Sequence, residues 1–148
     1  MAAEYSSIAT QIVAENALVT FSNGERACRK GCIEHRSDSG VFTIKGANNC
    51  RATYRVWFGA NVAVAPAADG GVLAPVSLVI SESGEPLGNT VMTVTPAAIG
   101  DTFNISASTF ISLPCGCCKT LAVRNISDGT AITVANANII FKRVSRGG

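Results

Sequence analysis

RATYRVWFGANVAVAP, residues 51–66, is the longest stretch of the chain in which apolar and aromatic side chains recur with one clear period. They stand at alternate positions: Tyr54, Val56, Phe58, Ala60, Val62 and Val64. Because successive side chains of a β-strand point to opposite faces, this alternation predicts a long strand with one buried face. The opposite face mixes Arg55, Trp57 and Asn61, so we expect it to contact something other than bulk water. The stretch is predicted to be the central strand of an all-β domain.

Shorter segments with a period of two lie on either side of this strand along the chain. Turn sequences such as Ser22-Asn23-Gly24 and Ser127-Asp128-Gly129 separate them. The further predicted strands are 17–21, 41–45, 76–81, 89–95, 103–107, 109–113, 119–125, 131–135 and 138–144. About eight to ten short strands with regularly spaced turns, and no convincing helix, predict a β-sandwich or barrel.

The first sixteen residues have weak periodicity. Ile8 and Ile12 stand four apart, so a short helical turn and a β-arm lying on a neighbouring subunit are both open. We predict an N-terminal arm over residues 1–16 and a single sandwich domain over residues 17–148. The start, MAAEYSSIATQIV, has neither a basic region nor an unbroken apolar run, so we do not expect a secretory signal.

The composition favours self-association. Charged residues make up 15% of the 148 residues, against about 25% in an ordinary soluble domain, and hydrophobic residues make up 47%. This is little charge with which to cover the surface of a monomer, so we expect subunit interfaces. No apolar run approaches the roughly 20 residues of a membrane helix, so no membrane partner is expected. The net charge of +2 argues neither for nor against an anionic partner.

The chain has six cysteines: Cys28, Cys32, Cys50, Cys115, Cys117 and Cys118. The first two lie in a polar loop with CxxxC spacing, and the last three form the cluster CGCC. These spacings lack the repeated CxxC pattern that is typical of zinc sites, so no metal is predicted. A zinc site built from the loop and the CGCC turn is the alternative to buried thiols or to disulfides formed after release from the cell.

No catalytic or nucleic-acid-binding pattern stands out. The carboxylates are scattered and lie mostly in predicted turns, and the single histidine, His35, has no nucleophile at motif spacing. The aromatic residues, 6% of the chain, belong mostly to apolar strand faces rather than to a basic stripe. We therefore predict a protein that is not an enzyme, uses no cofactor and binds no nucleic acid.

The order of four segments resembles the jelly roll of tumour necrosis factor and of complement globular-head domains. The segments are FTIKG (42–46), CRATYRVWFGANVAV (50–64), VSLVISESGEPL (76–87) and NANIIFKRV (136–144). The resemblance covers roughly residues 40–144. It implies a jelly-roll β-sandwich that assembles as a compact homotrimer, with a closed set of heterologous contacts.

Two surfaces suit such a trimer interface: the second face of the central strand, and the aliphatic closing strand. The interface candidates are Arg55, Trp57, Asn61 and Ile140. In the alternative arrangement, Ile139 and Phe141 point into the sandwich core and Ile140 alone is exposed.

A second resemblance is to small, uncharacterised phage-associated proteins of gut Firmicutes. It is carried by Tyr54-Arg55-Val56, Gly84-Glu85-Pro86, Thr95-Pro96-Ala97-Ala98 and Gly116-Cys117-Cys118. This resemblance implies no activity. It does place the chain among proteins made in a bacterial cytoplasm and associated with phages.

We therefore expect a virion structural protein: a trimeric decoration, or cement, protein on the capsid surface of a bacteriophage, whose partner is the major capsid protein. It would bind where capsid subunits meet, so that several weak contacts act together. The contact candidates are Tyr5, Ile8 and Ile12 in the arm and Arg26, Arg29, Lys30 and Arg36 in a basic loop. For the loop, four ordinary solvated side chains are the alternative.

The second hypothesis is a trimeric ligand-binding head of the complement and tumour-necrosis-factor type, on a bacterial spore, a cell surface or a phage fibre. Such heads usually follow a collagen-like or coiled-coil stalk. Residues 1–16 are too short for either stalk, which favours the decoration protein.

Overall fold

The computed structural model describes residues 2–26, 33–36, 38–45, 52–65, 74–114, 118–127 and 131–145. Within these residues the regular structure is β-strand, apart from one 3-10 turn, η1 (Gly88–Thr90). The prediction of an all-β jelly-roll sandwich is confirmed. In this part of the chain no helix has the length and apolar character needed to cross a membrane.

The strands form two six-stranded antiparallel sheets in these residues. The first sheet has the order β10-β6-β12-β1-β3, and β2 also pairs with β12. Its members are β1 (Ala2–Ser7), β2 (Gln11–Val13), β3 (Asn23–Arg26), β6 (Ala52–Val64), β10 (Phe103–Leu113) and β12 (Ile132–Ser145).

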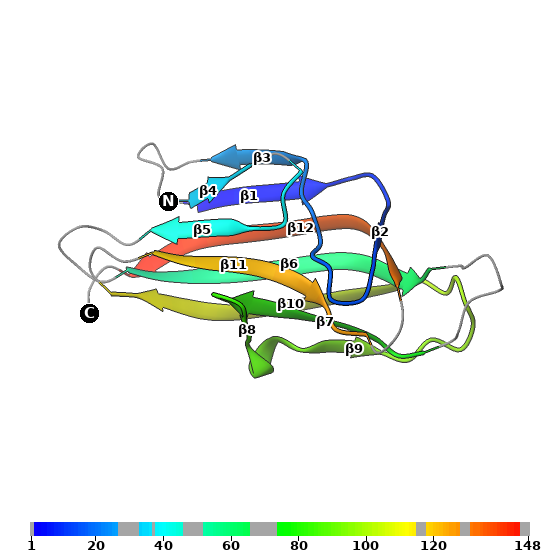
Figure 1. Ribbon diagram of the computed structural model, residues 1–148. Helices are drawn as coiled ribbons and strands as arrows, with labels where there is room; N and C mark the ends of the chain where they lie inside the picture. The colour runs from blue at the N-terminus through cyan, green and yellow to red at the C-terminus, as the bar shows by residue number, and fades with distance from the viewer. Residues whose placement is uncertain are drawn as a thin grey trace.

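The second sheet has the order β4-β5-β11-β7-β8, and β9 also pairs with β7. Its members are β4 (Ile33–His35), β5 (Phe42–Lys45), β7 (Val76–Glu82), β8 (Glu85–Pro86), β9 (Met92–Val94) and β11 (Cys118–Asn125). Figure 1 looks onto this sheet, with β6, β10 and β12 behind β11 and β7.

Strand β6 forms where the alternation predicts a strand, but it is not the central strand of its sheet: it lies between the edge strand β10 and β12, and β12 is the middle strand of the order. Tyr54, Val56 and Phe58 are buried as the alternation requires, while their neighbours on the strand are half-buried on the outer face. In β12, Ile139 and Phe141 are fully buried and Ile140 is half-buried, so the alternative arrangement of this strand is correct. Burial of such side chains contributes about 1.5–3 kcal/mol each.

The core between the sheets contains a cluster of aromatic rings. Phe42 lies 5.2 Å from Phe21 and 5.1 Å from Phe141, measured between ring centroids. Tyr5 packs edge-on against Phe42 at 4.9 Å. These rings join residues from the start, the middle and the end of the chain, so the core depends on the N-terminal segment.

Residues 1–16, predicted to form an arm, instead contribute two strands to the first sheet. β1 pairs with β12 from Ala2↔Lys142 to Ser7↔Ala137, and β2 pairs with the beginning of β12. Ala3, Tyr5 and Val13 are buried. The alternation of β1 escapes a hydrophobicity pattern because small alanine and serine side chains hold most of its inward positions.

Other boundaries differ from the prediction for similar reasons. Segment 17–21 makes only isolated bridges, and the predicted loop that follows contains the short strands β3 and β4, which are defined by pairing to β1 and β5. The two strands predicted over 103–113 are one strand, β10. The two predicted over 131–144 are also one, β12, whose register shifts between Ala135 and Asn138. Asn136, within this irregularity, has a φ of 53°, a conformation that asparagine tolerates better than most residues.

Candidate interaction surface

The outer face of the first sheet carries a cluster of one exposed and three half-buried side chains, which we call the outer patch: Phe110, and with it Arg55, Trp57 and Ile140. Arg55 and Trp57 are alternate residues of β6. Phe110 of β10 is opposite Arg55, and Ile140 of β12 is opposite Trp57. Directly opposed residues of an antiparallel pair point to the same face, so the register brings all four together.

The guanidinium of Arg55 lies near two aromatic rings of the outer patch. Its Cζ lies 4.3 Å from the centroid of the Trp57 ring and 5.8 Å from that of Phe110. A cation over an aromatic face is stabilised by about 0.5–1 kcal/mol at exposed sites, and by more when water is excluded. Phe110 is 62% exposed. Aromatic residues and arginine are the types most enriched where protein surfaces bind each other.

Small side chains surround the patch on the β10 side. Ser106, Ser108 and Ser112 are exposed on the same face of that strand. On β6, Gly59 leaves room for Asn138, since a Cβ at this position would lie 3.4 Å from Asn138 Oδ1. The aromatic side chains of the patch therefore project above short neighbouring side chains, and another protein surface can approach them closely.

Three of the four predicted interface candidates belong to the patch. The fourth, Asn61, lies further along β6, where its Oδ1 accepts a hydrogen bond of 3.1 Å from Asn104 Nδ2. Phe110 was not among the candidates. Phe110 is out of phase with Ile111 and Leu113, the apolar residues expected on the buried face of its strand, and this difference could have revealed it.

Four of the seven residues predicted to contact a capsid have side chains that the structure describes. Tyr5 is 3% exposed and packs against His35 and Phe42, so its selection as a contact residue was wrong. Ile8 and Ile12 are exposed, as is Arg36. The backbone of Arg26 belongs to β3, and Arg29 and Lys30 lie outside the described residues.

His35 has a packing role. Its ring stacks on Phe42 at 4.4 Å with an interplanar angle of 14°, and its Nε2 lies 2.8 Å from the Ser39 carbonyl oxygen. Burial raises the pKa of Tyr54, and the charge of Arg143 opposes this shift. Tyr54 donates a hydrogen bond to the Lys45 carbonyl, so its hydroxyl is part of the packed interior. Within the described ranges no three His, Cys, Asp or Glu side chains are grouped to hold a metal ion.

Of the six cysteines, one lies within the described residues. Cys118, at the start of β11, is an exposed free thiol rather than a buried or bridged one. Cys28, Cys32, Cys50, Cys115 and Cys117 lie outside the described residues, so their pairing stays a prediction.

Comparison with solved structures identifies proteins with the same fold. The chain superposes on the globular domain of zebrafish complement 1qA protein with a TM-score of 0.68 at 14% identity, over 99% of this chain and 98% of that one. It superposes on Eiger TNF from S. frugiperda with a TM-score of 0.66 at 12% identity, over 98% and 92%. For murine APRIL the TM-score is 0.58 at 10% identity, over 97% and 100%.

These similarities confirm the predicted resemblance to the tumour-necrosis-factor and complement jelly roll, and at these identities they concern the fold. No protein-family model matches the chain, and no curated protein matches it in sequence. The resemblance to phage-associated proteins stays a prediction.

Proposed function

We propose that this chain forms a homotrimer through the outer patch and that the trimer is a non-enzymatic ligand-binding head of the complement and tumour-necrosis-factor type. The observation that carries the proposal is the cluster on the outer face of the first sheet in which the half-buried Arg55 and Trp57 lie beside the exposed ring of Phe110. The full-length match to two such heads at TM-scores of 0.68 and 0.66 supports it.

The position of the patch suits a threefold assembly. β10 is an edge strand in the order of the first sheet, so the patch lies beside that edge. A cyclic trimer needs a contact between two different surfaces that closes after three copies. A sheet face meeting the edge of the next copy satisfies this requirement and excludes water from the aromatic rings. The low charge of the chain, 15%, agrees with such an interface.

The comparisons favour the ligand-binding head over the capsid decoration protein. The decoration hypothesis named an N-terminal arm and a basic loop as the contacts with a capsid. Strands β1 and β2, which occupy that part of the sequence, pair with β12 of the same chain. The head was the second hypothesis drawn from the sequence, and it is the better supported of the two.

Sedimentation tests the assembly directly. At micromolar concentration we expect one species with three times the chain mass of 15.2 kDa, because burying exposed aromatic rings favours association. Analytical ultracentrifugation measures this mass without a label. A stable, soluble monomer at the same concentration would contradict the proposal.

A further inference from the structure

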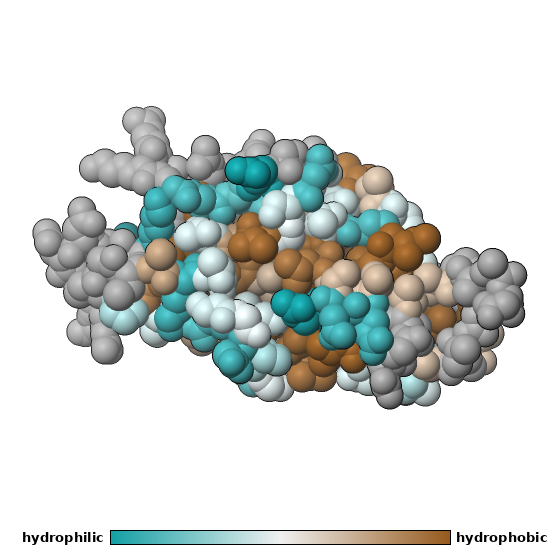
Figure 2. Space-filling model, in the orientation of Figure 1, coloured by the Kyte–Doolittle hydropathy of each residue, from teal (hydrophilic) through white to brown (hydrophobic). Residues whose placement is uncertain are grey.

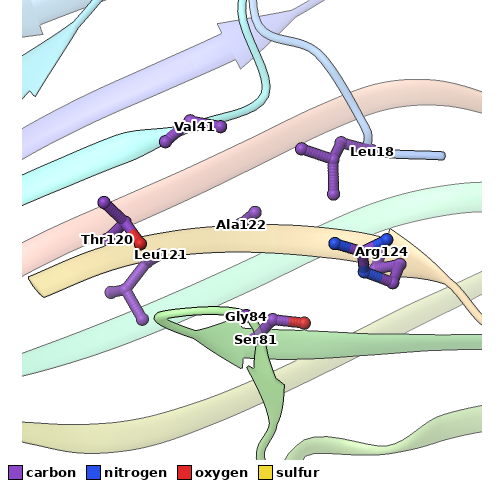
Figure 3. Close-up of a pocket in the computed structure, with 8 residues that line it drawn as sticks. All are labelled: Leu18, Val41, Ser81, Gly84, Thr120, Leu121, Ala122 and Arg124. Carbon is purple, nitrogen blue, oxygen red and sulfur yellow. The ribbon is translucent and has the colours of Figure 1, made fainter. Parts of the chain in front are cut away.

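A small hollow lies on the outer face of the second sheet, opposite to the side of the molecule that carries the outer patch. Its volume is about 160 Å³. Figure 3 shows it between the turn at Gly84, the middle of β11 and the side chains of Leu18 and Val41. In Figure 2, which views this face, polar and apolar side chains are interleaved, so the apolar surface here is broken into small areas.

Two small residues form the floor of the hollow. Ala122 of β11 is directly opposite Ser81 of β7, and both point to the outer face, yet they are only 9% and 2% exposed. Leu18 forms a wall, held against the chain at Gly40, where a Cβ would come within 2.7 Å of Leu18 Cβ. Val41, which is 40% exposed, forms the wall beside it. The hollow thus has an apolar body created by a short floor and taller walls.

Hydrogen-bond donors border this apolar body. Ser81 Oγ is buried, and it has no hydrogen-bond partner among the residues that the structure describes. Figure 3 shows this oxygen on the side of Arg124. Arg124 Nη1 donates to the Asn16 carbonyl at 2.7 Å, which fixes the guanidinium at the rim. The two ion pairs among the described residues involve Lys45 and Lys119, so in this part of the chain Arg124 has no carboxylate partner.

We propose that this hollow binds a small carboxylate with a branched aliphatic body. A cavity of about 150 Å³ accommodates a molecule of about benzene's size, so the hollow suits six to eight or so non-hydrogen atoms. The aliphatic body would lie against Leu18, Val41 and Ala122. The carboxylate would accept hydrogen bonds from Ser81 Oγ and from Arg124, giving the buried hydroxyl the partner that it lacks.

This inference rests on the proposed function in that it names a ligand class for the head. The hollow nevertheless belongs to a single chain, since all its lining residues come from one copy. Binding at the hollow and formation of the trimer can therefore be measured separately on the same sample.

The test is a titration of the full chain with 3-methylbutanoate, followed by the amide NMR shifts of Thr120 and Ala122. We expect saturable shifts and an affinity about tenfold or more above that of acetate, because each additional buried carbon contributes several-fold. The neutral 3-methylbutanamide should bind about tenfold more weakly than the carboxylate, since it lacks the charge that Arg124 recognises.

Three variants locate the site. Ala122→Leu fills the hollow and should abolish the saturable shifts. Ser81→Ala should weaken binding about fivefold while leaving the urea midpoint of the unliganded chain unchanged or higher, because no internal hydrogen bond is lost. Ser127→Ala is the matched control. The buried hydroxyl of Ser127 accepts a hydrogen bond of 2.8 Å from the Ser77 amide, so this change should lower the urea midpoint and leave binding unchanged.

Equal affinities for acetate and 3-methylbutanoate, the absence of saturable shifts, or binding that survives Ala122→Leu in a folded variant would overturn the inference. If Ala122→Leu does not fold, the comparison of Ser81→Ala with Ser127→Ala decides. A trimer that does not bind the probe would overturn this site alone, and a monomer that binds it would overturn the proposed assembly alone.

Discussion

A chain that begins at Ala17 should fail to form a stable sandwich. This truncation removes β1 and β2, and with them the buried side chains of Tyr5 and Val13. It also leaves β12 unpaired along the edge that β1 covers. Removing one large buried side chain costs about 3–5 kcal/mol, and two such losses with an unpaired edge approach the 5–15 kcal/mol or so by which a domain is stable. Circular dichroism during urea unfolding should show no cooperative transition.

The control for this truncation keeps the segment and changes only its exposed residues. Ile8 and Ile12 are 72% and 70% exposed, so replacing both with serine should change the free energy of unfolding by less than about 1 kcal/mol. A truncated chain that unfolds cooperatively at the urea midpoint of the full chain would show that the pairing of β1 and β2 with β12 is not needed.

Replacing Trp57 and Phe110 together with serine should convert the trimer to monomers. Interface aromatic residues that become fully desolvated contribute about 2 kcal/mol or more each, and a cyclic trimer repeats the contact at three interfaces. The dissociation constant should therefore rise by several orders of magnitude. Both side chains point away from the core, so the free energy of unfolding of the monomer should change little. Sedimentation velocity at micromolar concentration gives the mass of the variant.

The Ile8 and Ile12 double serine variant is again the matched control, because it removes two exposed apolar side chains from elsewhere on the surface. It should remain a trimer. If the Trp57 and Phe110 variant also remains a trimer at low micromolar concentration, the outer patch is not the interface.

The sequence predicted the middle of the fold better than its beginning. Strand β6 was predictable because apolar side chains recur at alternate positions over most of its thirteen residues. β1 was missed because Ala3 and Ser7, which are buried with Tyr5, are too small to mark its buried face. β3 and β4 are three or four residues long and depend on pairing partners that are distant in sequence. The local sequence pattern does not indicate which distant strand a short segment will pair with.

The same distinction applies to the candidate surfaces. Arg55, Trp57 and Ile140 were predictable because a strand with one buried face must present its other residues outward. The phase of Phe110 in its strand indicates an outward position, but its place opposite Arg55 followed only from the register of β10. The hollow could not have been predicted. Its floor and walls come from separate segments of the chain, and only the packing of Leu18 beside β11 makes it concave.

The position of β12 determines when the chain can finish folding during its synthesis. Residues 2–7 are synthesised long before their partners in the sheet, residues 137–142. β6 likewise waits for β12 along one of its edges. Contacts between such distant segments make folding slow, and until they form the unpaired edges are open to other chains. The nascent protein therefore passes through a long interval in which chaperone binding and aggregation compete for the same exposed strands.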